Sequence, residues 1–204
     1  MEWYIYFNFF YKTCQNFEKM KIVVAGPSKS GKSTIVNLLS QQYTQPTNYL
    51  GDGDGTNSNE MTGKNYTTTI VCQIMQIENF QSFMSSSSSS IEFWDVAGNC
   101  AGDAANCLPA IVNDSDGIIF VYNPLNPLQC SEIELWYELV MDVKGSRNDG
   151  SCLVLMHYDK LDATVSKEEE QTPSCLAKCS IRKTSYSTEA NEMRTIVSMF
   201  LEQL

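Results

Sequence analysis

Residues 26–33, GPSKSGKS, constrain this chain more than any other part of its sequence. They have glycine, four further residues and then Gly-Lys-Ser, and they stand between a short apolar run at 21–25 and a helical pattern at about 32–42. A strand, a loop of this pattern and a helix form a phosphate-binding loop, because the N–H groups of the loop and the positive end of the helix attract phosphate oxygens. The pattern therefore predicts an α/β domain that binds the phosphates of a nucleotide.

Two side chains of this loop have the chemistry expected at a nucleoside triphosphate. We expect the ammonium group of Lys32 to lie between the β- and γ-phosphates, and the hydroxyl of Ser33 to bind Mg²⁺. The other residues of the stretch that we expect to contact the nucleotide are Gly26, Ser28, Lys29, Ser30, Gly31 and Thr34.

A second motif, Asp-Val-Ala-Gly at 95–98, directly follows an expected strand at 91–94. Asp95 can hold Mg²⁺ through water, and the backbone N–H of Gly98 can meet a γ-phosphate. Because the carboxyl ends of parallel strands meet at one edge of a sheet, we expect this motif to lie beside the glycine-rich loop. The predicted metal-binding residues are therefore Ser33 and Asp95.

A third motif, Asp-Lys-Leu-Asp at 159–162, follows an apolar run and resembles the Asn-Lys-x-Asp guanine clamp of small GTPases. The resemblance implies that Asp162 accepts two hydrogen bonds from guanine, which adenine cannot supply, and that the stem of Lys160 lies along the base. Asp159 departs from the pattern, because an ionised carboxylate only accepts hydrogen bonds where the amide of asparagine would donate.

Thr-Ser-Tyr at 184–186 follows the last expected strand and resembles the Ser-Ala-x loop of the same proteins. That loop contacts the guanine oxygen through backbone N–H groups, so we include Ser185 and Tyr186 among the predicted nucleotide-binding residues. The triplet carries weight only because it comes after the three other motifs in the expected order.

The remaining apolar runs complete the predicted fold. The order strand, helix, two strands, helix, strand, helix, strand, strand, helix indicates one α/β domain with a mixed, six-stranded, mostly parallel sheet and helices on both faces. We expect the six consecutive serines at 85–90 to form a solvated hairpin insertion. The predicted strands are 21–25, 69–77, 91–94, 117–122, 152–157 and 179–184, and bounds are predicted for three of the four helices, at 32–42, 131–143 and 193–204.

Composition disfavours several classes of function. The chain has 204 residues and a formal charge of −10, which disfavours nucleic acid and anionic membrane surfaces as partners. No apolar run is long enough for a membrane-spanning helix, and eight scattered cysteines indicate reduced thiols in a cytoplasmic protein. Residues 1–19 hold seven aromatics within 1–11; we expect a disordered or loosely docked extension, or a wrongly chosen start codon upstream of Met20, and a domain spanning 20–204.

Several segments together resemble the Rab-like small GTPases of the intraflagellar transport B complex. They are GPSKSGKS at 26–33, FWDVAG at 93–98, LPAIVNDSDGIIFVYN at 108–123 and EIELWYELV at 132–140. The resemblance implies a P-loop small-GTPase-like domain that binds GTP or GDP with Mg²⁺. It also implies docking on coiled-coil subunits of that complex, and a location in the cilium or flagellum and at its base.

Three positions bear on how well such a protein would hydrolyse GTP. Asn99 stands where efficient enzymes have a water-orienting glutamine, and its side chain is one methylene too short for the same water. Ser28 stands where an arginine finger usually needs the clearance of glycine, so we expect slow hydrolysis. The switch threonine that would complete the Mg²⁺ site is Thr47, Thr67 or Thr68, or none of them.

The sequence leaves three functions open: a nucleotide-binding interaction subunit, a switch enzyme that cycles with an activating protein, and a phosphotransferase. The last is disfavoured because the chain lacks an arginine-rich lid segment. The only histidine, His157, ends an apolar run and is interpreted as an interior residue rather than a base. Trp136 is interpreted as a core residue or as a docking point for a partner helix.

Overall fold

A computed structural model describes residues 19–41, 69–81, 88–99, 103–145, 151–159 and 172–204. The apolar run ahead of the glycine-rich loop forms the central strand β1 (Lys19–Ala25). It pairs in parallel with β3 (Ser88–Val96) on one side and with β4 (Gly117–Tyr122) on the other. Strands on both sides and helices over both faces bury residues 22–25 of this strand almost completely, as expected of a strand in a parallel sheet.

The sheet has six strands in the order β2-β3-β1-β4-β5-β6. Only the pair of β2 (Cys72–Gln81) with β3 is antiparallel, while β5 (Cys152–Tyr158) and β6 (Ser180–Ser185) continue the parallel part. The predicted mixed, mostly parallel sheet is confirmed. In the described residues its helices are α2 (Lys32–Gln41), α3 (Asp103–Val112), α4 (Pro127–Lys144) and α5 (Ala190–Leu201), with a short 3₁₀ turn, η2 (Ser174–Leu176).

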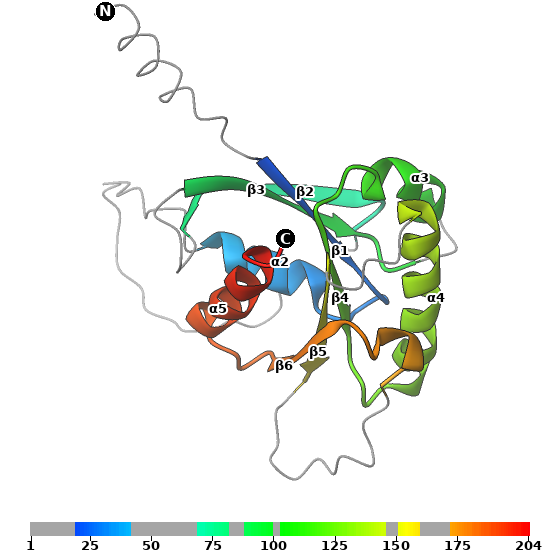
Figure 1. The fold of residues 1–204 in the computed structure, drawn as a ribbon. Coiled ribbons are helices and arrows are strands. Elements are labelled where there is room, and N and C mark those ends of the chain that lie inside the picture. The colour runs from blue at the N-terminus through cyan, green and yellow to red at the C-terminus, as the bar shows by residue number, and fades with distance from the viewer. Residues whose placement is uncertain (1–18, 42–68, 82–87, 100–102, 146–150, 160–171) are drawn as a thin grey trace, which may run out of the picture.

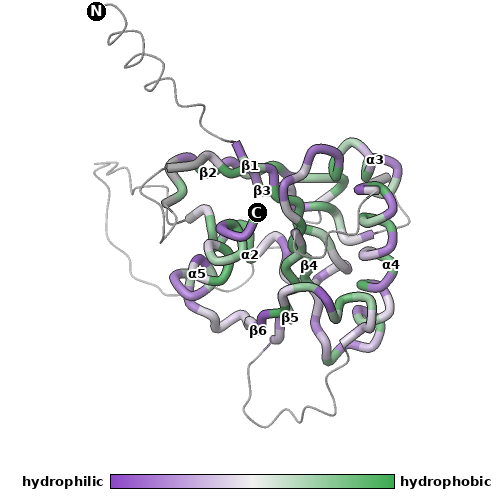
Figure 2. The backbone as a smooth tube through the Cα atoms, viewed as in Figure 1, coloured by the Kyte–Doolittle hydropathy of each residue, from purple (hydrophilic) through white to green (hydrophobic). Residues whose placement is uncertain are grey.

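The helices divide between the two faces of the sheet, as predicted (Figure 1). α3 and α4 pack on one face around Trp136 and Phe120, and α2 and α5 pack on the other around Ile35 and Phe200. Figure 2 shows the apolar residues concentrated along the central strands between these layers. Trp136 is fully buried, so it belongs to the core and is not a docking point.

The serine tract differs from its prediction. Ser88–Ser90 form the first part of β3, where Ser88 pairs with Gln81, Ser89 with Phe80 and Ser90 with Lys19. Pairing through the backbone needs no apolar side chain, so two neighbouring strands extend β3 into the tract despite its composition. The prediction of an insertion between the strands is therefore wrong for these three serines, which belong to β3, and 85–87 lie outside the described residues.

Two element boundaries also shift for local reasons. β1 begins two residues before its prediction, because Lys19 still pairs with Ser90 and its Nζ lies 2.7 Å from Oε1 of Glu92. α4 begins at Pro127, four residues early, because Oδ1 of Asn126 accepts the N–H of Leu128 at 3.1 Å and so caps the helix.

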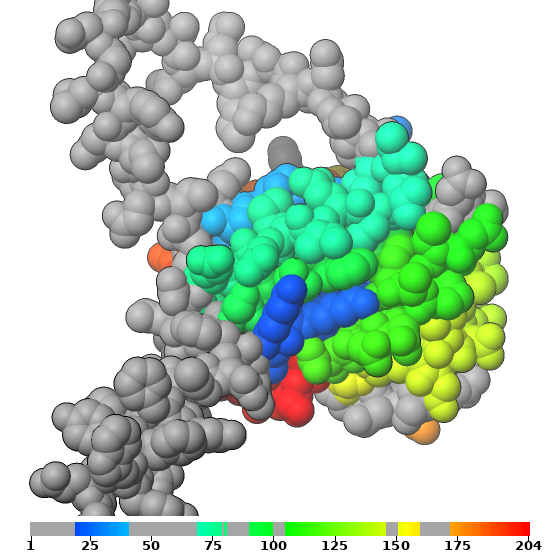
Figure 3. All heavy atoms as spheres, turned by 90° about the horizontal axis from the view of Figure 1, so that it is seen from above, coloured from blue at the N-terminus to red at the C-terminus, as the bar shows by residue number. Residues whose placement is uncertain are grey.

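The start of β1 reaches the surface between the β2–β3 pair and the α3 side of the molecule, as the space-filling view from above shows (Figure 3). Lys21 bridges the two parts. Its Nζ lies 4.2 Å from the centre of the Trp94 ring in β3 and donates to the carbonyl of Asn113, after α3, at 2.8 Å. None of the helices in the described part of the chain is long and apolar enough to span a membrane.

Candidate nucleotide-binding site

The glycine-rich loop joins β1 to α2 at the carboxyl edge of the sheet, and two of its glycines are required by geometry. Gly26 has φ +142°, and a Cβ there would lie 2.2 Å from the carbonyl oxygen of Val121 in β4. Gly31 has φ +95°, and its carbonyl accepts the N–H of Ile35 at 2.9 Å as the first turn of α2 forms. The loop therefore presses against the sheet at one end and turns into the helix at the other.

Lys32 is held inside the loop. Its Nζ donates to the carbonyl of Pro27 at 2.6 Å, and its side chain is buried. Desolvation by this burial lowers the pKa of Lys32 to about 8, although the carboxylates of Asp95 and Glu132 act in the opposite direction. The ammonium group thus sits in a poorly hydrated position where phosphate oxygens would be strong partners.

Ser33 and Asp95 meet as predicted for residues of one site. Oγ of Ser33 donates to Oδ2 of Asp95 at 2.5 Å, and Oγ1 of Thr69 donates to the same oxygen at 3.5 Å. Oδ1 of Asp95 is buried without a hydrogen-bond partner among the described residues. Burial raises the pKa of Asp95, while the Ser33 hydrogen bond and the charge of Lys32 lower it. One carboxylate with an unused oxygen and two hydroxyls suit Mg²⁺, which prefers oxygen ligands.

Thr69 is a residue of this cluster that the sequence analysis missed. Thr47, Thr67 and Thr68 lie outside the described residues, whereas Thr69 reaches Asp95 from just before β2. The signal was the run of three threonines at 67–69, but its register was obscured by the mispredicted strand start at 69, since β2 begins at Cys72.

The Asp-Val-Ala-Gly motif lies against the loop. A Cβ at Gly98 would come within 2.4 Å of both Cα and N of Ser28, so only glycine allows the two segments to pack this closely. The N–H of Ala97 donates to the carbonyl of Val71 at 2.9 Å, which ties the motif to the segment before β2. Asn99 follows at an exposed position.

Gln129 at the start of α4 supports the loop from the opposite side. Its Nε2 donates to the carbonyl of Ser28 at 3.4 Å, and its Oε1 accepts the N–H of Asn123 at 2.8 Å. The side chain is buried and links the loop to the end of β4. No local sequence signal indicates this contact, because Gln129 and Ser28 are 101 positions apart.

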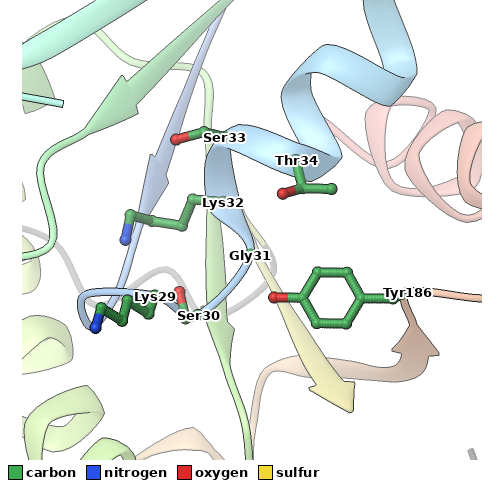
Figure 4. A pocket seen from close by; sticks show the side chains of 7 residues that line it. All are labelled: Lys29, Ser30, Gly31, Lys32, Ser33, Thr34 and Tyr186. Atoms are coloured by element: carbon green, nitrogen blue, oxygen red, sulfur yellow. The ribbon is translucent and has the colours of Figure 1, made fainter. Parts of the chain in front are cut away.

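A cavity of about 410 Å³ opens beside the loop and is lined by its residues 29–34 and by Tyr186 (Figure 4). The Tyr186 side chain points from the end of β6 toward the loop at Gly31. The N–H of Tyr186 donates to the carbonyl of Tyr158 at 3.3 Å, and that of Ser185 donates to Oγ1 of Thr188 at 2.8 Å. Tyr186 therefore lines the cavity with its ring, while both N–H groups have partners within the protein.

The remaining predicted base-binding residues, Lys160 and Asp162, lie outside the described residues. Asp159, which precedes them, is exposed at the end of β5. β5 and β6 are adjacent, and Tyr158 at the end of β5 pairs with Ser185 at the end of β6. The position of Asp159 is therefore beside the Thr-Ser-Tyr turn. The structure thus brings the start of the predicted clamp and the Thr-Ser-Tyr turn to the same edge as the loop.

A phosphate loop between the first strand and helix, an aspartate at the end of β3 and this six-stranded order define a small-GTPase-like P-loop domain. No family model matches the chain. Its particular resemblance is to intraflagellar transport protein 22. The Danio rerio homologue is 29% identical over 187 residues, which are 90% of this chain and 88% of the relative.

Two solved structures agree with this resemblance. The T. brucei IFT22/74/81 GTP-bound crystal structure superposes with a TM-score of 0.64 at 27% identity, covering 91% of this chain and 94% of that one. The T. brucei IFT22 GTP-bound crystal structure gives a TM-score of 0.59 at 25% identity, covering 90% and 94%. The predicted resemblance to Rab-like subunits of intraflagellar transport is confirmed by these three matches.

Proposed function

We propose that this chain is a Rab-like guanine-nucleotide-binding subunit of the intraflagellar transport particle, which binds GTP or GDP with Mg²⁺ and hydrolyses GTP slowly. The observation that carries the proposal is that Lys32 and Ser33 line one cavity at the carboxyl edge of the sheet, where Ser33 is hydrogen-bonded to Asp95. The two GTP-bound IFT22 structures supply independent support, since each covers nine-tenths of this chain.

In this proposal the loop binds the phosphates and three oxygen-bearing side chains hold the metal. Lys32 exchanges the carbonyl of Pro27 for phosphate oxygens, and the backbone N–H groups of residues 28–34 surround the phosphate chain. Ser33, Asp95 and Thr69 would hold Mg²⁺, which neutralises phosphate charge when it is bound. The unpaired Oδ1 of Asp95 supports this assignment because a buried carboxylate oxygen needs a partner.

For the base we propose recognition by Asp162, with Lys160 along the ring and the turn at Ser185 and Tyr186 beside it. Asp162 selects guanine by accepting from two donors that adenine lacks. Asp159 weakens this selection, since its carboxylate faces base acceptors that need a donor. We therefore expect moderate affinity for guanine nucleotides with a clear preference over ATP.

We propose that hydrolysis is slow because Asn99 replaces the water-orienting glutamine. Its shorter side chain misplaces the amide by more than about an ångström, and misplacement on that scale costs about a hundredfold. Ser28 adds bulk near the γ-phosphate side of the loop, where its Cα already lies against Gly98.

The partners that we propose are the coiled-coil subunits of the intraflagellar transport B complex, and the place of action is the cilium or flagellum and its base. One of the structures similar to this chain is of IFT22 together with IFT74 and IFT81, which supports assembly with subunits of that kind.

Calorimetric titration of nucleotide-stripped protein tests the proposal. With Mg²⁺ present, GTP and GDP should bind and ATP should bind at least tenfold more weakly. Lys32→Ala should abolish the heat, whereas Lys178→Ala, at an exposed lysine outside the site, should retain it within about threefold. The absence of heat with both GTP and GDP for the folded wild-type chain would refute the proposal.

A further inference from the structure

The one histidine of the chain lies underneath the glycine-rich loop. His157 is 3% exposed near the end of β5. Its Nδ1 shares a hydrogen bond with Oγ1 of Thr184, buried in β6, at 3.0 Å. Its Nε2 is buried and has no hydrogen-bond partner among the described residues. The expectation of an interior residue is met, but only one of the two ring nitrogens is paired.

The same imidazole supports the loop directly. A Cβ built on Gly31 would lie 2.5 Å from Cδ2 and 2.9 Å from Nε2 of His157, so the backbone of Gly31 rests against that edge of the ring. No side chain larger than hydrogen fits between them. Gly31 is therefore required by the position of His157 as well as by its φ of +95°.

The ring also contacts the aromatic wall of the cavity. The Tyr186 ring meets His157 edge to face, with 4.6 Å between the ring centres and an angle of 73° between the planes. Such contacts are favourable for aromatic rings at this separation. One side chain thus touches the loop at Gly31, the strand β6 at Thr184 and the cavity wall at Tyr186.

This position does not suit an acid or base. Burial lowers the pKa of His157 and so favours the neutral ring, although the carboxylate of Asp159 opposes the shift. The contacts of the ring are a threonine hydroxyl, a glycine backbone and a phenol ring. The ring instead lies between Gly31 of the loop and the end of β6, where it contacts Thr184 and Tyr186.

We propose that His157 is a positioning residue of the nucleotide site, which holds the phosphate loop at Gly31 in register with Thr184 near the end of β6 and with Tyr186 in the turn that follows. The inference rests on the proposed function, because register between these two loops matters for a ligand that contacts both. Nδ1 fixes the ring through Thr184, and the opposite edge of the ring supports Gly31. Removal of that edge leaves a gap beneath Gly31, so the loop can shift relative to the end of β6 and Tyr186, and a ligand that contacts both is bound less well.

Two substitutions separate the roles of the ring nitrogens. His157→Asn keeps a polar atom near Nδ1 for Thr184 and removes the edge beneath Gly31. His157→Gln extends a polar atom toward the Nε2 position and refills part of that space. Val154→Ala, in the buried middle of the same strand, is the matched control for lost packing without contact to the loop.

Affinities for Mg²⁺-GTP and for Mg²⁺-tripolyphosphate, each with the melting temperature of the nucleotide-free protein, test the proposal. We expect His157→Asn to weaken GTP binding by about tenfold or more. It should weaken tripolyphosphate binding by a smaller factor, because that ligand contacts only the loop. His157→Gln should recover part of the loss, and Val154→Ala should lower the melting temperature while binding GTP within about threefold of wild type.

Three results would overturn the proposal. The first is a GTP affinity of His157→Asn within threefold of wild type. The second is an equal loss of affinity for GTP and for tripolyphosphate. The third is a loss of GTP affinity no greater than that of Val154→Ala when the two variants have equal melting temperatures. If His157→Asn does not fold, the GTP affinities of His157→Gln and Thr184→Val decide instead. Each should be weakened more than the affinity for tripolyphosphate, and equal losses for the two ligands would overturn the proposal. Failure of the wild-type chain to bind GTP would refute the proposed function instead, so the two failures are distinguishable.

Discussion

Lys32 offers a prediction whose size follows from the structure. Its pKa of about 8, against an ordinary 10.5, means that folding disfavours the ammonium form. At about 1.4 kcal/mol per pH unit, the charged side chain destabilises the folded state by about 3 kcal/mol at pH 7. The side chain is only 6% exposed, so solvent screening removes little of this amount. Lys32, which we propose binds phosphate, should therefore lower the stability of the nucleotide-free fold.

The sign of the pH dependence follows from proton binding. Between about pH 8 and pH 10.5 the unfolded chain keeps the Lys32 proton and the folded chain has lost it, so stability rises with pH in that range. Lys32→Met removes the ionisable group and keeps the length of the side chain. We predict that the free energy of unfolding of wild type, relative to Lys32→Met, rises by about 2–3 kcal/mol from pH 7.5 to pH 10.

Urea unfolding of both nucleotide-free proteins, followed by circular dichroism at several pH values, measures this difference. At pH 7 the variant should be the more stable of the two by about 1–3 kcal/mol. The free-energy cost of burying the ammonium group is larger than the contribution of its one hydrogen bond, to the carbonyl of Pro27, which the variant loses. A difference between the two proteins that stays constant from pH 7.5 to pH 10 would refute the reasoning, because Lys32 would then titrate alike in both states.

Three further predictions concern the nucleotide. Asp95→Asn should raise the Mg²⁺ concentration needed to slow GTP dissociation by at least about tenfold, with exposed Asp114→Asn as control; equal Mg²⁺ dependence in both would contradict the metal assignment. Asn99→Gln should accelerate single-turnover GTP hydrolysis, up to about a hundredfold, and an unchanged rate would mean that another group limits the reaction. Asp159→Asn should increase the preference for GTP over ATP about tenfold in competition titrations, because an amide donates where a carboxylate cannot; an unchanged preference would exclude contact with the base.

The fold was largely predictable because its signals are local. Unbroken apolar runs such as 117–122 and 152–157 predict buried parallel strands, and the structure places β4 and β5 there with every residue buried. The boundary errors arose where pairing partners or caps lie elsewhere in the chain. Ser88–Ser90 join β3 through their neighbours, and Asn126 starts α4 with a side-chain cap that the apolar periodicity does not register.

The residues of the candidate site likewise divide into those that local motifs predict and those that reach the site from distant segments. The loop and Asp95 were predicted from short motifs, and the structure brings Ser33 and Asp95 into contact across 62 positions of sequence. Thr69 and Gln129 were missed. Thr69 reaches Asp95 from a segment whose register the motifs do not determine, and Gln129 reaches Ser28 from the start of a distant helix.

These missed contacts share a physical cause, which also explains why His157 was interpreted incompletely. A phosphate loop can be recognised from its own sequence, because it needs glycine at positions with particular backbone angles, and those angles are a local property. What surrounds the loop is set by side chains from β5 and α4, whose positions depend on the packing of the whole sheet. His157 and Gln129 each contact the loop backbone at a different point, Gly31 and Ser28. Substitutions at either one should therefore change nucleotide affinity while every residue of the recognisable motif stays intact.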